Sequence, residues 1–362
     1  MKIFHCDHCQ HLVFFENVHC VQCKHSLAYL PDLADMGSLE PAGTDLWQTP
    51  HPNAQGKTYR LCKNYSQESV CNWAIRADDP NTLCQSCRLT RVLPDLSKPG
   101  HREAWQRLEI AKRRLVYSLL CLKLPLWNKQ EDPDNGLAFE FLADPSAGAP
   151  GAAPVLTGHA SGVITLNVAE ANDAEREKRR LALHEPYRTL LGHFRHEIAH
   201  YYWDLLVKDS DRLDPFRALF GDERASYDEA LARHYAQGPV PDWQQRFVTA
   251  YASTHPWEDW AETWAHYLHM ADALETAIGS GLSLRPDRAD EPVLTPNLHM
   301  NGCHPANFDD MIRAWFPLTY LLNNLNRGLG LPDGYPFVLS TPVIDKLRFV
   351  HQVIEGGAVP ST

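Results

Sequence analysis

The sequence has too little positive charge for a nucleic-acid-binding protein and no apolar run long enough for a membrane span. Its 362 residues contain 34 Lys and Arg against 45 Asp and Glu, which gives a formal net charge of −11. This balance leaves no broad basic surface for a phosphate backbone or an anionic lipid. The most apolar stretch, residues 115–127, is interrupted by Lys123 and Pro125 and is shorter than the roughly 20 residues of a transmembrane helix. We therefore expect neither a nucleic-acid partner nor a membrane anchor.

The first residues also lack the uninterrupted apolar run of a secretory signal, because Cys6, His8, Cys9 and His11 follow one another closely. Eight of the 10 cysteines lie within the first 87 residues, mostly as C-x-x-C pairs. In a chain without an export signal, this arrangement favours thiolate metal ligands over disulfides. We therefore expect a protein of the reducing cytoplasm.

Two groups of four cysteines predict two structural zinc sites. The first group consists of two C-x-x-C pairs separated by ten residues, as in a zinc ribbon, and comprises Cys6, Cys9, Cys20 and Cys23. The second group is spaced less regularly and comprises Cys62, Cys71, Cys84 and Cys87. Four cysteine ligands leave no open position on zinc, so each ion would stabilise a small segment without doing chemistry. Residues 1–95 carry 8 Lys and Arg against 10 Asp and Glu, which argues against nucleic-acid binding by this part.

Apolar periodicity divides the rest of the chain into helices and short strands. Apolar residues recur every three or four positions over residues 101–124, which predicts a long amphipathic helix. Apolar runs and alternation predict strands at residues 137–143 and 163–168. Two further helices, over residues 186–207 and 256–274, are expected to carry the chemistry.

The segment from His196 to His200 reads H-E-x-x-H within an apolar helical stripe. Residues four apart on a helix lie one above the other, so both imidazoles can bind one zinc ion. Glu197 is then turned toward a water on the same metal and can take its proton as a general base. His193 is expected to line the cleft or to bond a neighbouring residue, without binding the metal. Asp204 is either a partner of a ligand histidine or a solvated side chain.

A catalytic zinc ion usually has three protein ligands and one open position, so a third ligand must lie downstream. The metzincin pattern is excluded because Leu206 stands where that class has its third histidine. In the helix that is expected to begin at Pro256, Glu258 and Glu262 share one face with small residues. We interpret Glu258 as the third ligand and Glu262 as the acceptor that orients a ligand histidine. The reverse order, with Glu262 on zinc and His266 behind it, stays open because spacing alone does not orient the helix.

Peptide hydrolysis also needs a hydrogen-bond donor for the developing oxyanion. Tyr251, seven residues before Glu258, is the candidate donor, and a tyrosine of the core is the alternative. The predicted strand at residues 163–168 can line the cleft and pair with an extended substrate, as exposed sheet edges do.

Three segments carry a family resemblance. They are the cysteine pairs of residues 6–23, the phrase LAYLPD at residues 27–32 and the phrase RHEIAHYYW at residues 195–203. Together they resemble a bacterial family of zinc-binding metallopeptidases with an N-terminal zinc ribbon, over nearly the whole chain. The resemblance implies a peptidase-like zincin domain without naming a substrate.

A second, local resemblance concerns Tyr251, Glu258 and Glu262. Their spacing is similar to that in the zinc site of anthrax lethal factor, where a Glu ligand, a Glu one turn later and an upstream Tyr are arranged in this way. This similarity implies that Glu258 is the metal ligand and that Glu262 lies behind a ligand histidine.

The predicted fold class is α+β, with a zinc-ribbon module over residues 1–98 and a mainly helical zincin-like metallopeptidase domain with a small sheet over residues 99–362. The predicted function is a gluzincin-like zinc peptidase that cleaves peptide or protein substrates, with one catalytic and two structural Zn²⁺ ions. Two alternatives remain open. One is a non-catalytic protein-binding module on a zincin scaffold, and the other is a zinc-dependent hydrolase of a non-peptide amide.

Overall fold

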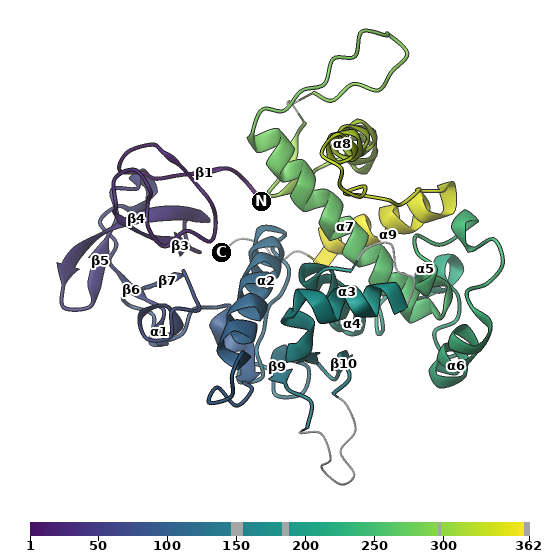
Figure 1. Cartoon of the computed structure of the whole chain (residues 1–362), viewed down its shortest axis with the longest axis horizontal. Helices are drawn as coiled ribbons and strands as arrows, with labels where there is room; N and C mark the ends of the chain where they lie inside the picture. The colour runs from purple at the N-terminus through teal and green to yellow at the C-terminus, as the bar shows by residue number, and fades with distance from the viewer. Residues whose placement is uncertain (146–154, 183–187, 296–297, 358–362) are drawn as a thin grey trace.

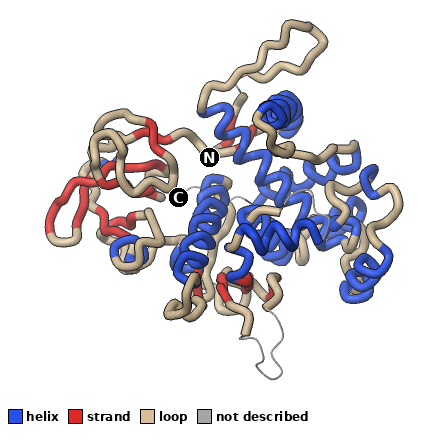
Figure 2. The backbone as a smooth tube through the Cα atoms, viewed as in Figure 1, coloured by secondary structure: helices blue, strands red, loops and turns tan. Residues whose placement is uncertain are grey.

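The structure is a computed structural model and describes residues 1–145, 155–182, 188–295 and 298–357. Strands gather in the N-terminal part of the chain and helices in the remainder, with a small sheet between them (Figures 1 and 2). The prediction of an α+β fold, with a cysteine-rich N-terminal module before a largely helical domain, is therefore confirmed.

The N-terminal part contains a hairpin and an antiparallel sheet. In the hairpin, β1 (Phe4–His5) pairs with β2 (Leu12–Val13). The sheet has five strands in the order β3 (Ser26–Leu30), β4 (Asp35–Gly43), β5 (Leu46–Gln48), β6 (Tyr59–Leu61) and β7 (Ala74–Arg76). Short helical turns connect the strands, namely η1 (Pro52–Ala54), α1 (Lys63–Ser66) and η2 (Cys87–Leu89).

Asp7 links the first cysteine pair to this sheet. One of its carboxylate oxygens accepts a hydrogen bond from the backbone amide of Ser38 at 2.7 Å, and the other accepts from the Thr49 hydroxyl at 2.6 Å. Hydrogen bonds to a carboxylate are stronger than those between neutral groups. The loop between Cys6 and Cys9 is thus held against β4 by its own side chain.

Aromatic packing against α2 (His101–Cys121) joins the N-terminal part to the helical part. The ring of Tyr117 lies 5.5 Å from that of Phe15 and 5.8 Å from that of Tyr29. The Tyr117 hydroxyl donates to Glu275 on a helix of the second part at 2.6 Å. Because the same side chain touches both parts, their buried residues form one continuous core.

A second sheet spans the boundary near residue 98. Its order is β10 (Gly158–Ala160), β11 (Val163–Asn167), β9 (Ala138–Leu142) and β8 (Thr90–Val92). Strand β8 precedes the predicted boundary and pairs in parallel with β9, so the sheet combines both segments. Strand β11 is paired on both sides, by β10 and by β9. The prediction that residues 163–168 pair with a substrate is therefore wrong, since β11 is interior and the edge strands of this sheet are β10 and β8.

Two long helices pack against each other through aromatic side chains. The rings of Tyr202 and Trp264 stack at 5.2 Å with an interplanar angle of 20°. The indole of Trp260 donates to the backbone carbonyl of Ala199 at 2.8 Å, which satisfies a buried polar group. The two helices are α4 (Leu190–Leu206) and α7 (Pro256–Gly279).

Local capping explains where these helices begin. The Thr189 hydroxyl accepts from the amide of Gly192 at the start of α4. Nδ1 of His255 accepts from the amide of Trp257 at the start of α7, and Pro256 occupies the first turn, where its missing N–H costs nothing. The predicted start of the earlier helix at residue 186 lies outside the described residues.

The remaining elements surround this pair. They are η3 (Val168–Ala171), α3 (Asp173–Ala182), α5 (Leu213–Phe220), α6 (Tyr227–Gln237), η4 (Trp243–Gln245), η5 (Tyr251–Ser253), the hairpin of β12 (Met300–Asn301) and β13 (His304–Pro305), α8 (Phe308–Gly328) and α9 (Thr341–Gly357). Among the described segments, no helix is both long and apolar enough to cross a membrane.

A buried ion pair fixes α9 to the first turn of α7. The Lys346 ammonium donates to Asp259 at 2.6 Å and to the backbone carbonyl of Arg246 at 2.8 Å. Both charged side chains are almost fully buried, at 6% and 1% exposed. Burial raises the pKa of Asp259 to about 7 although the Lys346 charge opposes this shift. The pair therefore has to stay intact for the carboxylate to remain ionised in the core.

We predict that Lys346→Ala lowers the free energy of unfolding by about 3–5 kcal/mol, because it leaves Asp259 buried without a cation. Denaturant titration followed by tryptophan fluorescence measures this loss. The control is Lys208→Ala, which removes a partly exposed pair with Asp204 at 3.6 Å and should cost less than about 1 kcal/mol. Equal losses in the two variants would contradict the assigned role of the buried pair.

Candidate metal centre

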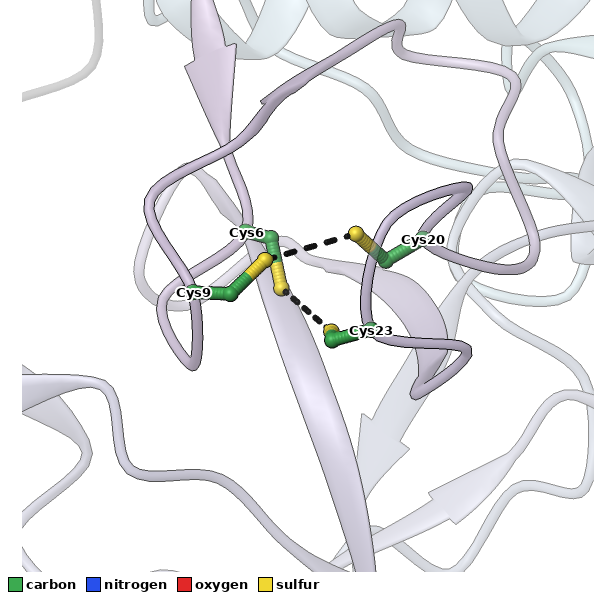
Figure 3. A group of neighbouring side chains, drawn as sticks. All are labelled: Cys6, Cys9, Cys20 and Cys23. Carbon is green, nitrogen blue, oxygen red and sulfur yellow. Dashed lines mark hydrogen bonds between the residues drawn. The ribbon is translucent and has the colours of Figure 1, made fainter.

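The first cysteine group forms a compact cluster of four sulfur atoms (Figure 3). The Sγ atoms of Cys6 and Cys23 are 3.6 Å apart, and so are those of Cys9 and Cys20. A disulfide would require about 2.05 Å, whereas four sulfurs at about 2.3 Å from a tetrahedral zinc ion are roughly 3.8 Å apart. The spacing thus suits zinc, and all ten cysteines are free.

The two C-x-x-C loops have matching backbone structures. The amide of Cys6 donates to His11 O, and the amide of Cys20 donates to His25 O, both at 2.9 Å. The fourth residue after each first cysteine has a positive φ, 62° for Gln10 and 66° for Lys24. Two equivalent turns therefore present two sulfurs each to one central point.

The second cysteine group is also assembled and is fully buried. Its ligand atoms lie within 4.8 Å of one another, and the residues are Cys62, Cys71, Cys84 and Cys87. Backbone amides donate to three of the sulfurs at 3.3–3.4 Å, from Trp73 to Cys71, from Cys84 to Cys62 and from Cys87 to Cys84. Such N–H···S contacts stabilise thiolates, which are the form that binds zinc.

A third group lies between α4 and α7 and consists of His196, His200 and Glu258, whose ligand atoms also fall within 4.8 Å of one another. Nε2 of His196 is 3.0 Å from one carboxylate oxygen of Glu258, and Nε2 of His200 is 3.9 Å from the other. The structure therefore brings together the three residues that the motif and the downstream helix predicted as a zinc site.

Glu262 lies behind one of these histidines. Nδ1 of His196 donates to Oε1 of Glu262 at 2.7 Å, and the Thr249 hydroxyl donates to Oε2 at 2.8 Å. Both oxygens of Glu262 are thus engaged away from the cluster. Nδ1 of His266 contacts the Tyr335 hydroxyl at 2.7 Å instead of a ligand carboxylate. This geometry favours Glu258 as the third ligand and disfavours the reverse order.

The donor set fits a divalent cation. Because Nδ1 of His196 carries the proton donated to Glu262, Nε2 faces Glu258 with a lone pair unless a proton or a metal ion lies between them. Within the described residues, no hydrogen-bond donor reaches Oε2 of Glu258, although the residue is only 2% exposed. Burial alone would lower the pKa of His196, but the adjacent carboxylates of Glu258 and Glu262 raise it well above its usual range. The site thus attracts positive charge, which zinc would supply.

The same buried environment also shifts the pKa values of His200 and Glu197. Burial lowers the pKa of His200 to about 3, which keeps its imidazole in the neutral form that binds metals. Burial raises the pKa of Glu197 to about 7, with the His196 charge opposing the shift and the Glu258 and Glu262 charges adding to it. A carboxylate with a pKa near neutrality is suited to exchange protons at physiological pH.

Two tyrosines lie beside the cluster. The ring of Tyr251 is 6.0 Å from that of His196, so the candidate oxyanion donor is placed at the metal group. The hydroxyl of Tyr227 donates to Oε1 of Glu258 at 2.8 Å. Neither Tyr227 nor Thr249 was predicted, because no motif or fixed spacing connects them to the helix that carries Glu258.

His159 was also missed. It lies on the edge strand β10, and its ring stacks on that of His200 at 6.2 Å with an interplanar angle of 18°. Its Nε2 accepts from the amide of Gly162 at 3.0 Å, so its tautomer is fixed. Burial lowers the pKa of His159 to about 4. A histidine in a three-residue strand gives no sequence signal for such a position.

Two other candidates lie apart from the metal group. Nδ1 of His193 is 3.4 Å from the buried carboxylate of Glu170, which matches its predicted position outside the ligand set. Asp204 is paired with Lys208 at 3.6 Å and is about one-third exposed. Of its two predicted roles, the structure therefore favours a solvated side chain over a partner of a ligand histidine.

Comparisons with known sequences show which proteins the chain is similar to. Residues 101–353 match the family described as "Putative zinc-binding metallo-peptidase", and residues 3–98 match a zinc-ribbon domain. Uncharacterized proteins of Mycobacterium bovis and of two strains of Mycobacterium tuberculosis are each 42% identical over 356 residues, which covers 98% of this chain and 96% of each relative. No solved structure matches the chain.

We predict that Cys84→Ser releases one zinc ion and destabilises the N-terminal part, because a buried ligand of a closed site is lost. Elemental analysis after desalting measures the metal, and thermal unfolding measures the stability. Cys303→Ser changes a buried cysteine outside both groups and should keep the full zinc content. Zinc retention in Cys84→Ser would show that this group is not a metal site.

We also predict that Glu258→Ala and Glu262→Ala weaken zinc binding to different degrees. Loss of Glu258 should abolish stoichiometric binding at this centre, whereas loss of Glu262 should weaken it about 10- to 100-fold by releasing the His196 ring. Chelator competition measures both affinities. Asp204→Ala, on the same helix as the histidines, should bind as the wild type does. A larger loss for Glu262→Ala than for Glu258→Ala would reverse their roles.

Proposed function

This chain belongs to the zinc-binding metallo-peptidase family, and on that premise we propose that it hydrolyses peptide bonds at the centre formed by His196, His200 and Glu258. The observation that carries the proposal is the convergence of these three ligand atoms beside the buried carboxylate of Glu197. Two histidines of one helix and a glutamate of a later helix make a gluzincin-like ligand set.

When bound, zinc supplies Lewis-acid chemistry, lowering the pKa of a coordinated water towards 7 and polarising a carbonyl group. Glu197 accepts the proton of the attacking water at its carboxylate and later donates it to the leaving amine. The Tyr251 hydroxyl donates a hydrogen bond to the oxygen on which negative charge develops. Glu262 keeps the His196 ring in one tautomer and orientation throughout.

The exposed edge of β10 supports a peptide substrate over a small amide. Among the described residues, β10 pairs in its sheet with β11 alone, and its His159 ring stacks on His200. An extended peptide can add to such an edge through backbone hydrogen bonds and so cross the metal centre. A small amide would gain nothing from this edge.

We further propose three zinc ions per chain, one at this centre and one in each cysteine group. The cysteine sites serve as structural supports, since each is closed to water and substrate. The acidic net charge of −11 supports peptide or protein substrates over nucleic acid, and eight thiol ligands support a reducing, cytoplasmic location.

We predict that Glu197→Gln keeps all three zinc ions but lowers kcat by about 10²- to 10⁴-fold, because the amide cannot accept a proton. Cleavage of a quenched-fluorescent peptide library measures the rate, and elemental analysis measures the metal. Asp204→Asn makes the same chemical change on the same helix and should leave the rate unchanged.

The zinc content and the cleavage rates distinguish a peptidase from a non-catalytic binding protein and from an amidase. A Glu197→Gln variant as fast as the wild type would refute the mechanism. A wild type that holds three zinc ions but cleaves no peptide would favour a non-catalytic binding protein, and one that cleaves only small amides would favour an amidase.

A further inference from the structure

The two carboxylate oxygens of Glu258 have different surroundings. Oε1 accepts a hydrogen bond from the Tyr227 hydroxyl at 2.8 Å. Oε2 lies 3.0 Å from Nε2 of His196 and is reached by no hydrogen-bond donor among the described residues. The side chain is 3% exposed, so water cannot make the two oxygens equivalent.

The difference between the two oxygens affects how many coordination positions of the metal remain open. A carboxylate can bind a metal through one oxygen or through both. With two histidines, binding through both oxygens would fill four positions, whereas binding through one leaves a position for water or substrate. A hydrogen bond to Oε1 favours the second mode, because that oxygen already has a partner.

We propose that Tyr227 is a positioning residue that holds Glu258 as a one-oxygen ligand and thereby keeps the zinc centre open. This inference rests on the proposed function, because it concerns the same centre. Tyr227 acts through Glu258 and is not itself one of the three ligand residues.

Tyr251 lies beside the same centre, with its ring 6.0 Å from that of His196. The Tyr227 proton is donated to the ligand carboxylate of Glu258. The two hydroxyls therefore have separate roles, Tyr227 on the ligand and Tyr251 on the substrate oxygen.

Contacts with His255, at the start of the helix that carries Glu258, hold Tyr227 in this position. The ring of Tyr227 lies edge-on to that of His255 at 5.3 Å, and His255 caps α7. Nε2 of His255 also contacts the carbonyl oxygen of Ala225, two residues before Tyr227, at 3.1 Å. Both contacts and the bond to Glu258 therefore fix the start of α6 against the start of α7.

Helix α6 has few other buried contacts. Of its 11 residues, Ala230 alone is buried, and the helix lies at the periphery of the helical part (Figure 1). Its position should therefore depend on the Tyr227 hydroxyl and on the ligand it holds. This gives the proposal a readout that is independent of catalysis.

The test replaces Tyr227 by Phe and loads Co²⁺ into the exchangeable centre after a mild chelator has removed its zinc, with zinc retained in the cysteine sites. We expect the Co²⁺ d–d absorption of Tyr227→Phe to weaken and shift as a second carboxylate oxygen binds. We expect the affinity for Co²⁺ to fall about 10-fold, as for loss of other groups that orient a ligand. Hydrogen exchange of residues 227–237 should become faster than in the wild type.

Two variants make the comparison specific. Tyr251→Phe should keep the wild-type Co²⁺ spectrum and affinity while lowering kcat, because it removes only the oxyanion donor. Tyr320→Phe removes a hydroxyl from a side chain that is 72% exposed on α8 and should change none of the readouts. The spectrum and affinity are measurable even if no peptide is cleaved, so failure of the proposed function would not be confused with failure of this inference.

A wild-type spectrum and affinity in Tyr227→Phe would overturn the proposal. So would a spectral change of the same size in Tyr251→Phe, because Tyr227 would then have no separate effect on Glu258. If Tyr227→Phe unfolds, Tyr227→Leu, which also lacks a hydrogen-bond donor, is loaded in the same way, and an unchanged spectrum there would also refute the proposal.

Discussion

The imidazole of His196 lies between two carboxylates of α7, and this buried arrangement ties the metal centre to the packing of the two long helices. Glu262 accepts from Nδ1 at 2.7 Å while Glu258 faces Nε2 at 3.0 Å. Two buried negative charges around one ring are costly unless positive charge is added. Tyr202 and Trp264 pack the same helices together, so apolar contacts hold the carboxylates in a position that water alone would not stabilise.

The N-terminal part is stabilised in a different way. Its strands are short, with at most nine residues, and its first 25 residues contain only a two-residue-per-strand hairpin. Such a segment has little secondary structure of its own, and zinc bound by the cysteine groups would cross-link it. Tyr117 then connects this part to α7 through Glu275, near the end of that helix, whereas the metal centre lies at its start.

The sequence predicted those features that depend on local periodicity. The three residues His196, Glu197 and His200 follow from the repeat of the helix, and Glu258 and Glu262 follow from the next helix by the same rule. Tyr227, Thr249 and His159 could not be found in this way, because long connections of irregular length bring them to the site. The interior position of β11 was missed for a related reason. Alternating apolar residues reveal a strand, but the pairing of its two edges is decided by strands elsewhere in the chain.

The start of α7 shows why a metal ion is the natural complement of this site. Glu258 and Asp259 lie in the first turn of the helix and Glu262 in the next, where the helix dipole offsets only part of the cost of burying three carboxylates. Asp259 has the ammonium of Lys346, and Glu262 has His196 and Thr249. Oε1 of Glu258 has the Tyr227 hydroxyl at 2.8 Å and Nε2 of His200 at 3.9 Å, whereas Oε2 faces only Nε2 of His196 at 3.0 Å. Burial alone would raise its pKa, but the adjacent ring and charge of His196 lower it to about 2. A carboxylate that remains ionised with one oxygen unmatched, between two imidazoles, is a ligand set that zinc completes.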